Sequence, residues 1–299
     1  MYSAKLKVGN VIAVYGVRPS AGASTLAAMT ASVLAARGEK TLLLSTDADI
    51  PYDAVSLLSD EIADNHMDEL VVLENSNGLN AERMADYITF LTDNLGYIRA
   101  SAKLTRLTKD AARTINNIVD MACYDFRYVV VDIGYASTPY ANAILQKADL
   151  VMHALGQDSK SIASAVSFYK HGGFGEEKYT VPILTDYIPD IPGDAKSLRK
   201  ALDVEEVFSI AHSASVFKAC ASRNIASFVY KGVRRKGGLF GGLGRKSKGE
   251  ADEAAVGTLD EICDLIMKAL EDSTSETFAA LTNMRPGDAT NAAQQEGWN

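Results

Sequence analysis

The sequence predicts an α/β protein with a doubly wound, mainly parallel sheet and helices on both faces. Two observations carry this prediction. From about residue 8 to residue 230, apolar runs that suit buried strands alternate with longer segments of helical periodicity. Most of these runs are apolar throughout, as in strands that are covered on both faces. Right-handed crossovers are therefore expected between successive strands.

The expected strands are short apolar runs that end at polar residues or glycines. They lie at residues 11–15, 41–44, 128–131, 149–154 and 179–184. Helices are expected at residues 26–37, 81–95, 105–122, 138–146, 159–171, 197–202 and 214–223, with at best a short strand between the last two. Glycines directly after residues 37 and 171 are natural helix ends.

Composition changes after residue 230 and divides the chain into four expected parts. Residues 1–230 form the α/β domain. Residues 231–250 form a linker or contact loop, because KGVRRKGGLFGGLGRKSKG is basic and too rich in glycine for a stable helix in water. Residues 251–271 are expected to form a helix that packs on the domain. Residues 272–299 are polar and are expected to be a disordered tail.

Composition also excludes several classes of protein. The 299-residue chain has a net charge of −8, so it is not a wholly basic nucleic-acid binder. Its three cysteines are few and widely spaced, which argues for a reducing compartment and against a disulfide framework. Its four histidines lack the spacing of metal ligands. We expect neither a signal peptide nor a membrane span, because the apolar runs are too short. A cytoplasmic location follows as an expectation.

A glycine-bearing loop, GVRPSAGAST, connects the strand at 11–15 to the helix at 26–37. At such a junction, backbone amides and the helix dipole favour an anion. A P-loop adds a lysine for the phosphates and a Ser or Thr hydroxyl for Mg²⁺. Here Gly16 and Gly22 are kept, and Ser24 and Thr25 take the hydroxyl positions, but Ala23 stands at the lysine position. By its motif alone, the loop is equally well an ordinary strand-to-helix turn.

Two acids favour the phosphate-binding interpretation. Asp132 ends the apolar run YVVV, at the position of the acid that holds the Mg²⁺ shell in such folds. Asp47 follows the strand at 41–44, in a loop that would face a γ-phosphate. Because the carboxyl ends of parallel strands meet at one edge of the sheet, the loop and both acids are expected to lie together.

On these residues the chain resembles the ParA/MinD group of deviant-Walker ATPases, whose loop reads GxKGGxGKST. Laid over that pattern, Arg18 takes the position of the signature lysine, which reaches across a dimer to the partner's nucleotide. Pro19 and Ser20 replace two glycines, and Ala23 replaces the main lysine. The resemblance covers roughly residues 8–230. Within the group, such a degenerate first motif is similar to the TadZ/CpaE branch, which helps to localise pilus or secretion machinery.

Three further segments extend the resemblance. LLLSTD has Ser45 in place of the first acid of the next family motif and Asp47 at the second, which positions the attacking water. VVVDIGYAS carries Asp132 as the Mg²⁺-shell acid. ILTDYIPD lies where the family has its adenine-flanking segment, with Asp186 and Tyr187 as the matching residues.

The resemblance implies ATP (or ADP) and Mg²⁺ as cofactors, with Asp47 and Arg18 as catalytic residues and Ser24 and Asp132 as metal residues. The implied cofactor-binding residues are Arg18, Pro19, Ser20, Ala21, Gly22, Ala23, Ser24, Thr25, Asp186 and Tyr187. Loss of one donor aimed at the transferring phosphoryl group costs about 10²–10³-fold in rate. The expected activity is therefore at most a weak ATPase. Arg18 either compensates, within the subunit or across a dimer, or is a solvated loop arginine.

Three functions stay open at this point. The first is a TadZ-like localisation or assembly factor for pilus or secretion machinery, a nucleotide-stabilised homodimer in the cytoplasm or peripheral at the inner face of the membrane or the cell pole. The second is a slow ParA-type ATPase in DNA partition or conjugation. The third is a nucleotide-free scaffold or filament protein. The stretch 231–249 is a flexible linker, a contact with an anionic membrane through Leu239, Phe240 and Leu243, or, less favoured, a DNA contact.

Overall fold

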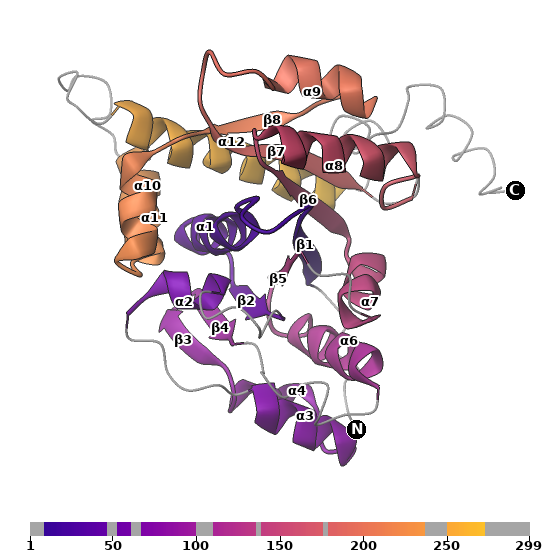
Figure 1. Ribbon diagram of the computed structural model, residues 1–299. Helices are drawn as coiled ribbons and strands as arrows, with labels where there is room; N and C mark the ends of the chain where they lie inside the picture. Colours follow the sequence, from indigo (N-terminus) through magenta and orange to yellow (C-terminus); the bar gives the residue numbers. More distant parts are fainter. Residues whose placement is uncertain are drawn as a thin grey trace, which may run out of the picture.

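The computed structural model describes residues 9–46, 53–60, 67–99, 110–135, 139–175, 179–236 and 250–272 (Figure 1). Within these residues the chain forms one eight-stranded sheet in the order β3-β4-β2-β5-β1-β6-β7-β8. The strands are β1 Asn10–Gly16, β2 Thr41–Ser45, β3 Thr89–Thr92, β4 Leu95–Ile98, β5 Tyr128–Gly134, β6 Leu150–Leu155, β7 Thr180–Tyr187 and β8 Phe208–Ala211. Neighbouring strands are parallel except β3 and β4. The predicted fold class is confirmed.

Helices cover both faces of this sheet, as the ribbon in Figure 1 shows. One face carries α1 (Ala23–Ala36), α2 (Ala54–Leu58), α10 (Ala214–Ala221), α11 (Ile225–Lys236) and α12 (Glu250–Asp272). The other face carries α3 (Met67–Asn75), α4 (Ala81–Ala85), α6 (Ala111–Ala122), α7 (Pro139–Lys147), α8 (Ser159–Lys170) and α9 (Ala195–Leu202). The strand order reverses around β1, which places a ligand crevice at its carboxyl end.

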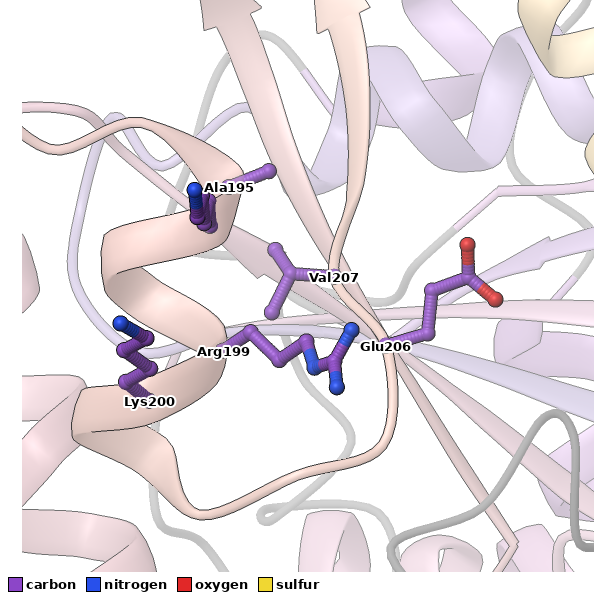
Figure 2. A pocket seen from close by; sticks show the side chains of 6 residues that line it. Ala195, Arg199, Lys200, Glu206 and Val207 are labelled. Carbon is purple, nitrogen blue, oxygen red and sulfur yellow. The ribbon is translucent and has the colours of Figure 1, made fainter.

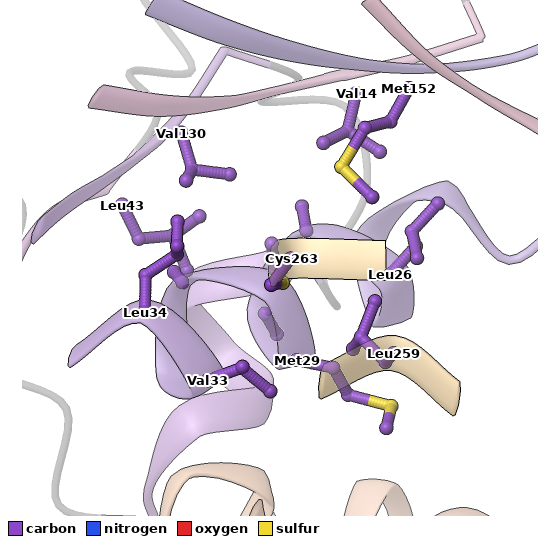
Figure 3. Close-up of a cluster of buried hydrophobic side chains, with 14 of the residues drawn as sticks. Val14, Leu26, Met29, Val33, Leu34, Leu43, Val130, Met152, Leu259 and Cys263 are labelled. Atoms are coloured by element: carbon purple, nitrogen blue, oxygen red, sulfur yellow. The ribbon is translucent and has the colours of Figure 1, made fainter. Parts of the chain in front are cut away.

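Helix α1 is the centre of the larger core. Its side chains are buried almost all round, because the sheet lies on one side and α2, α11 and α12 enclose the others. Figure 3 shows Leu26 and Met29 of α1 in one cluster with Met152 of the sheet and Leu259 and Cys263 of α12. A helix that is apolar all round is stable only in such a position. The core therefore fixes the helix whose N-terminus forms the predicted loop site.

The predicted helix at 81–95 is wrong beyond its first turn. The chain forms α4 and then a hairpin, β3 and β4, with a turn at Asp93 and Asn94. Aspartate and asparagine favour such turns, and the stretch around them is rich in threonine and isoleucine, which favour strands. Pairing of β4 with β2 then adds two strands to the sheet. Helices α2 and α3 were also not predicted.

The expected boundary at residue 230 is crossed by α11, which continues to Lys236. The prediction that no stable helix begins this stretch is therefore wrong for its first six residues. A Cβ atom on Gly232 would lie 2.9 Å from Val256 Cγ1, so this glycine allows α12 to approach closely. The remaining predicted linker, the tail and residues 105–109 of a predicted helix lie outside the described residues. No helix in the described part of the chain is long and apolar enough to cross a membrane.

Candidate functional site

The loop between β1 and α1 is shaped by two residues with left-handed backbone, Ser20 (φ 64°) and Gly22 (φ 81°). A Cβ atom on Gly22 would lie 2.9 Å from Thr185 Oγ1, so only glycine fits there without a shift. The buried hydroxyl of Thr185 donates to the carbonyl oxygen of Ala21 at 2.7 Å and to that of Leu155 at 3.1 Å. Thr185 on β7 thereby holds the loop against the end of the sheet.

The N-terminus of α1 offers backbone donors to a ligand. Its first intrahelical hydrogen bond runs from Leu26 N to Gly22 O at 2.9 Å. The amides of Ala23, Ser24 and Thr25 therefore have no partner within the helix. Gly22 makes no side-chain cap, and the first turn contains no acid. With the helix dipole, these amides favour a phosphate-sized anion.

Asp132, at the carboxyl half of β5, is fully buried and receives three hydrogen bonds. Oδ1 accepts from Gly134 N at 3.1 Å, Oδ2 accepts from Ala54 N at 3.1 Å, and the side chain of Ser24 bonds the same carboxylate. The pKa of Asp132 is raised to about 6, mainly by burial and to a smaller extent by the charge of Asp53, against the lowering effect of the three hydrogen bonds. The structure thus brings together the two predicted metal residues.

The chemistry of this pair suits Mg²⁺, which prefers carboxylate and other oxygen ligands. In the described part of the chain, no three His, Cys, Asp or Glu side chains are grouped so that they would hold a metal ion by themselves. A Mg²⁺ ion here would therefore depend on Asp132, Ser24 and the phosphate oxygens of a ligand.

A cavity of about 320 Å³ adjoins the loop on the side of β7 and α10. Leu26, Met29 and Ile210 give it an apolar floor, and Thr25 and Ser213 add hydroxyl groups. Its volume lies at the lower end of the range of small-molecule sites, about 300–1,000 Å³, and such sites combine apolar walls with a few polar groups in the same way. The cavity and the amides of α1 together form one continuous candidate ligand site.

The structure separates the two residues predicted to flank a base. Asp186 borders the cavity with φ 56°, and its Oδ1 lies 2.7 Å from His212 Nδ1. Tyr187 instead packs with Leu184 and Leu198 in the cluster under α8 and α9, on the other face of the sheet. The pairing of β7 with β8 is irregular between Leu184 and Tyr187, and the left-handed backbone of Asp186 interrupts the alternation of side chains, so Asp186 borders the cavity whereas Tyr187 lies on the other face.

The other predicted residues lie around the loop. Ala21 and Ala23 are buried, whereas Pro19 and Ser20 are exposed. Arg18 is half-buried, and its charge acts on Asp158, the N-cap of α8. The pKa of Asp158 is lowered mainly by the hydroxyl and amide of Ser161, and Arg18 contributes to the same shift. Asp47 lies outside the described residues.

Two features of the site were missed by the sequence analysis. Thr185 stands directly before Asp186 in the segment ILTDYIPD, so that segment was the signal that could have drawn attention to it. The amide of Ala54 has no such signal, because a backbone donor leaves no trace in residue type.

A separate cavity of about 320 Å³ lies between α9 and the segment before β8 (Figure 2). Arg199 and Lys200 of α9 border it together with Glu206 and Val207. Because charges of both signs lie side by side there and no predicted site residue borders it, we assign the ligand site to the cavity beside the loop.

No protein-family model and no curated protein sequence matches the chain. Solved structures match it by shape. A ParA family ATPase from Chlorobium tepidum TLS superposes with a TM-score of 0.67 at 14% identity, over 86% of this chain and 98% of that one. The chain has the fold of the ParA and MinD ATPases.

Two further structures support this assignment of the ParA/MinD fold. MinD from Pyrococcus horikoshii OT3, complexed with Mg-ADP, gives a TM-score of 0.63 at 14% identity, over 87% of this chain and 97% of that one. A chain of the MinC:MinD cell division protein complex of Aquifex aeolicus gives 0.59 at 14% identity, over 86% and 96%.

Proposed function

We propose that the chain binds ATP or ADP with Mg²⁺ at this site and that the bound nucleotide stabilises a homodimer. One observation carries the proposal: Gly22 and Thr25, at the N-terminus of α1, border the 320 Å³ cavity, and the Ser24–Asp132 pair lies at the same helix end. The same fold in MinD from Pyrococcus horikoshii is complexed with Mg-ADP, which supports the choice of ligand.

Each part of the site has a role in this proposal. The amides of residues 22–25 donate hydrogen bonds to phosphate oxygens. Ser24 and Asp132 hold Mg²⁺, which would neutralise phosphate charge when bound. The nucleoside enters the cavity, where the carboxylate of Asp186 accepts hydrogen bonds from its polar edge. Asp47 and Arg18 remain the proposed catalytic residues.

Hydrolysis is proposed to be very slow or absent. Ala23 supplies no charged donor at the position where a P-loop has its lysine, and this loss is worth about 10²–10³-fold in rate. The nucleotide would then act as a structural ligand that holds an assembly together.

In the cell, we propose a TadZ-like localisation or assembly factor for pilus or secretion machinery, in the cytoplasm or peripheral at the membrane or cell pole. The support is the degenerate loop on a ParA/MinD fold. The MinC:MinD complex has this fold in an assembly with another protein, which supports a protein partner. A slow ParA-type ATPase acting on DNA is the second candidate, favoured by the retained Ser24–Asp132 pair.

The first experiment compares melting temperature and phosphate release with and without Mg²⁺ and each of ATP, ADP and a non-hydrolysable ATP analogue. At 100 times its Kd, a ligand should stabilise the fold by about 2.7 kcal/mol. Stabilisation without phosphate release over hours supports the proposal. No response to any nucleotide contradicts it and leaves the nucleotide-free scaffold.

Variants separate the two candidates. Ala23→Lys should raise phosphate release, because it restores the missing donor. As a control, Ala201→Lys adds the same charge at an exposed position of α9, on the other face of the sheet. Phosphate release by the wild type that Arg18→Ala abolishes, together with ATP-dependent and salt-sensitive DNA binding, would favour the partition ATPase.

A further inference from the structure

The Mg²⁺ side of the proposed site is closed by α2, a five-residue helix that begins at Ala54. We infer that the N-terminus of α2 is an autoinhibitory latch, which must leave Asp132 before a Mg²⁺-bound phosphate ligand can enter. This inference rests on the proposed function, because it concerns the regulation of the same site.

The latch and the metal compete for the same oxygens. An ionised carboxylate offers about four acceptor positions. Gly134 N, Ala54 N and the side chain of Ser24 already use three at Asp132, whose side chain is fully buried. Mg²⁺ usually keeps several waters, which need acceptors of their own. Only one position remains, and the carboxylate is fully buried, so withdrawal of Ala54 would free Oδ2 and open a way to it for the ion and its water.

Tertiary contacts hold α2 in this position. Val55 N donates to Ser45 Oγ at 3.4 Å, and Asp53 caps the helix by accepting from Ser56 N at 2.9 Å. Arg99 Nε lies 3.7 Å from Asp53 Oδ2. A helix of five residues has little stability by itself, so its place depends on these contacts.

While Ala54 is bonded to Asp132, repulsion between two carboxylates favours the withdrawal of α2. Asp53 and Asp132 are both buried, and their carboxylates lie near enough to repel each other. A cation at Asp132 would remove part of this repulsion but would bind only the open arrangement. A ligand that binds one of two states shifts the protein toward that state, and its apparent affinity is reduced by the fraction that is open.

The Ala54→Pro variant tests the hydrogen bond from Ala54 N to Asp132, on which the latch depends. Proline removes the amide proton that Asp132 accepts, and it is well tolerated at the first position of a helix. Asp53 has φ −72° and ψ 170°, a conformation that suits a residue before proline. Ala81→Pro is the matched control, because Ala81 begins α4, another five-residue helix with a capping Asn80, away from the site.

The measurement is the affinity for the ATP analogue AMPPNP with Mg²⁺ and with EDTA. A hydrogen bond to a charged acceptor is worth enough to change a binding equilibrium by about 10–100-fold. We expect Ala54→Pro to bind Mg²⁺–AMPPNP that much more tightly than the wild type, with no such gain in EDTA, and Ala81→Pro to bind like the wild type. Binding by Ala54→Pro alone would support the latch most directly.

Hydrogen exchange of the full-length wild type gives a second readout that needs no variant to fold. On addition of Mg²⁺–AMPPNP, amides 22–25 should exchange more slowly and amides 54–58 faster. Slower exchange at 22–25 with unchanged exchange at 54–58, or equal affinities of Ala54→Pro and the wild type, overturns the latch and leaves the proposed function standing. If neither protein binds and amides 22–25 are unaffected, the proposed function fails and the latch with it.

Discussion

At the scale of single residues, Thr185 holds the loop before α1 through one hydroxyl that reaches Ala21 and Leu155. The Thr185→Val variant keeps the shape of the side chain but leaves the carbonyl of Ala21 without its donor. We expect a loss of roughly 1–3 kcal/mol in unfolding free energy, measured in urea, and weaker AMPPNP binding. Thr185→Ser should restore both. A valine variant that binds like the wild type would show that Thr185 does not shape the loop.

A second residue-scale feature is His153, which lies among the rings of Tyr15, Phe168 and Phe174. Its Nδ1 is 3.1 Å from Tyr169 Oη, whereas its Nε2 is buried without a hydrogen-bond partner. Burial lowers the pKa of His153 from 6.5 to about 3. The imidazole is therefore neutral in the fold and charges only when the chain unfolds.

The pKa shift of His153 gives a pH prediction. A lowered folded-state pKa contributes stability above pH 6.5, and that stability is lost as the pH falls toward 3, because the unfolded state takes up the proton first. At pH 4 the loss approaches about 3 kcal/mol. His153→Phe should remove this part of the slope between pH 7 and 4. An unchanged slope in urea titrations of the variant would contradict the assignment.

At the scale of elements, the contact between α1 and α12 depends on Arg37. Its Nε donates to Asp260 Oδ1 and its Nη2 to the carbonyl oxygen of Asp260, both at 2.8 Å, and it also pairs with Asp264. The side chains of Arg37 and Asp260 are only 16% and 14% exposed, so solvent screens this pair weakly. These contacts of Arg37 with Asp260 and Asp264, called the Arg37 clamp below, join segments that are 223 residues apart.

Replacing Arg37 tests this clamp. Arg37→Met keeps the apolar stem but leaves Asp260 without its partner, and we expect a loss of about 2–3 kcal/mol in unfolding free energy. Arg127→Met is the control, because Arg127 pairs with Glu271 at 3.4 Å near the surface, where such a pair is worth about 1 kcal/mol or less. Equal losses in the two variants would mean that the clamp adds nothing specific.

At the scale of the whole molecule, the candidate site lies at the carboxyl ends of the parallel strands, and Arg18 lies in the adjoining loop next to the exposed Pro19 and Ser20. We expect Mg²⁺–AMPPNP to double the solution mass of the wild type, because the bound phosphates attract a cation from a second copy. Arg18→Glu should prevent the doubling while the melting temperature still rises with the analogue. Doubling without ligand, or by the variant, would separate dimerisation from nucleotide binding.

The sequence by itself determined the fold class and predicted which loop and which acid lie together at the candidate site. The short apolar runs at residues 11–15 and 128–131 form strands of the sheet. The loop before α1 lies near Asp132 of β5 because parallel strands end at one edge of the sheet. Only the tertiary structure showed that Ala54 N donates a hydrogen bond to Asp132. It also showed that Tyr187 faces away from the cavity and that α11 continues past residue 230. Each depends on contacts between distant segments, and a backbone amide or a close approach at Gly232 leaves no local pattern in the residues.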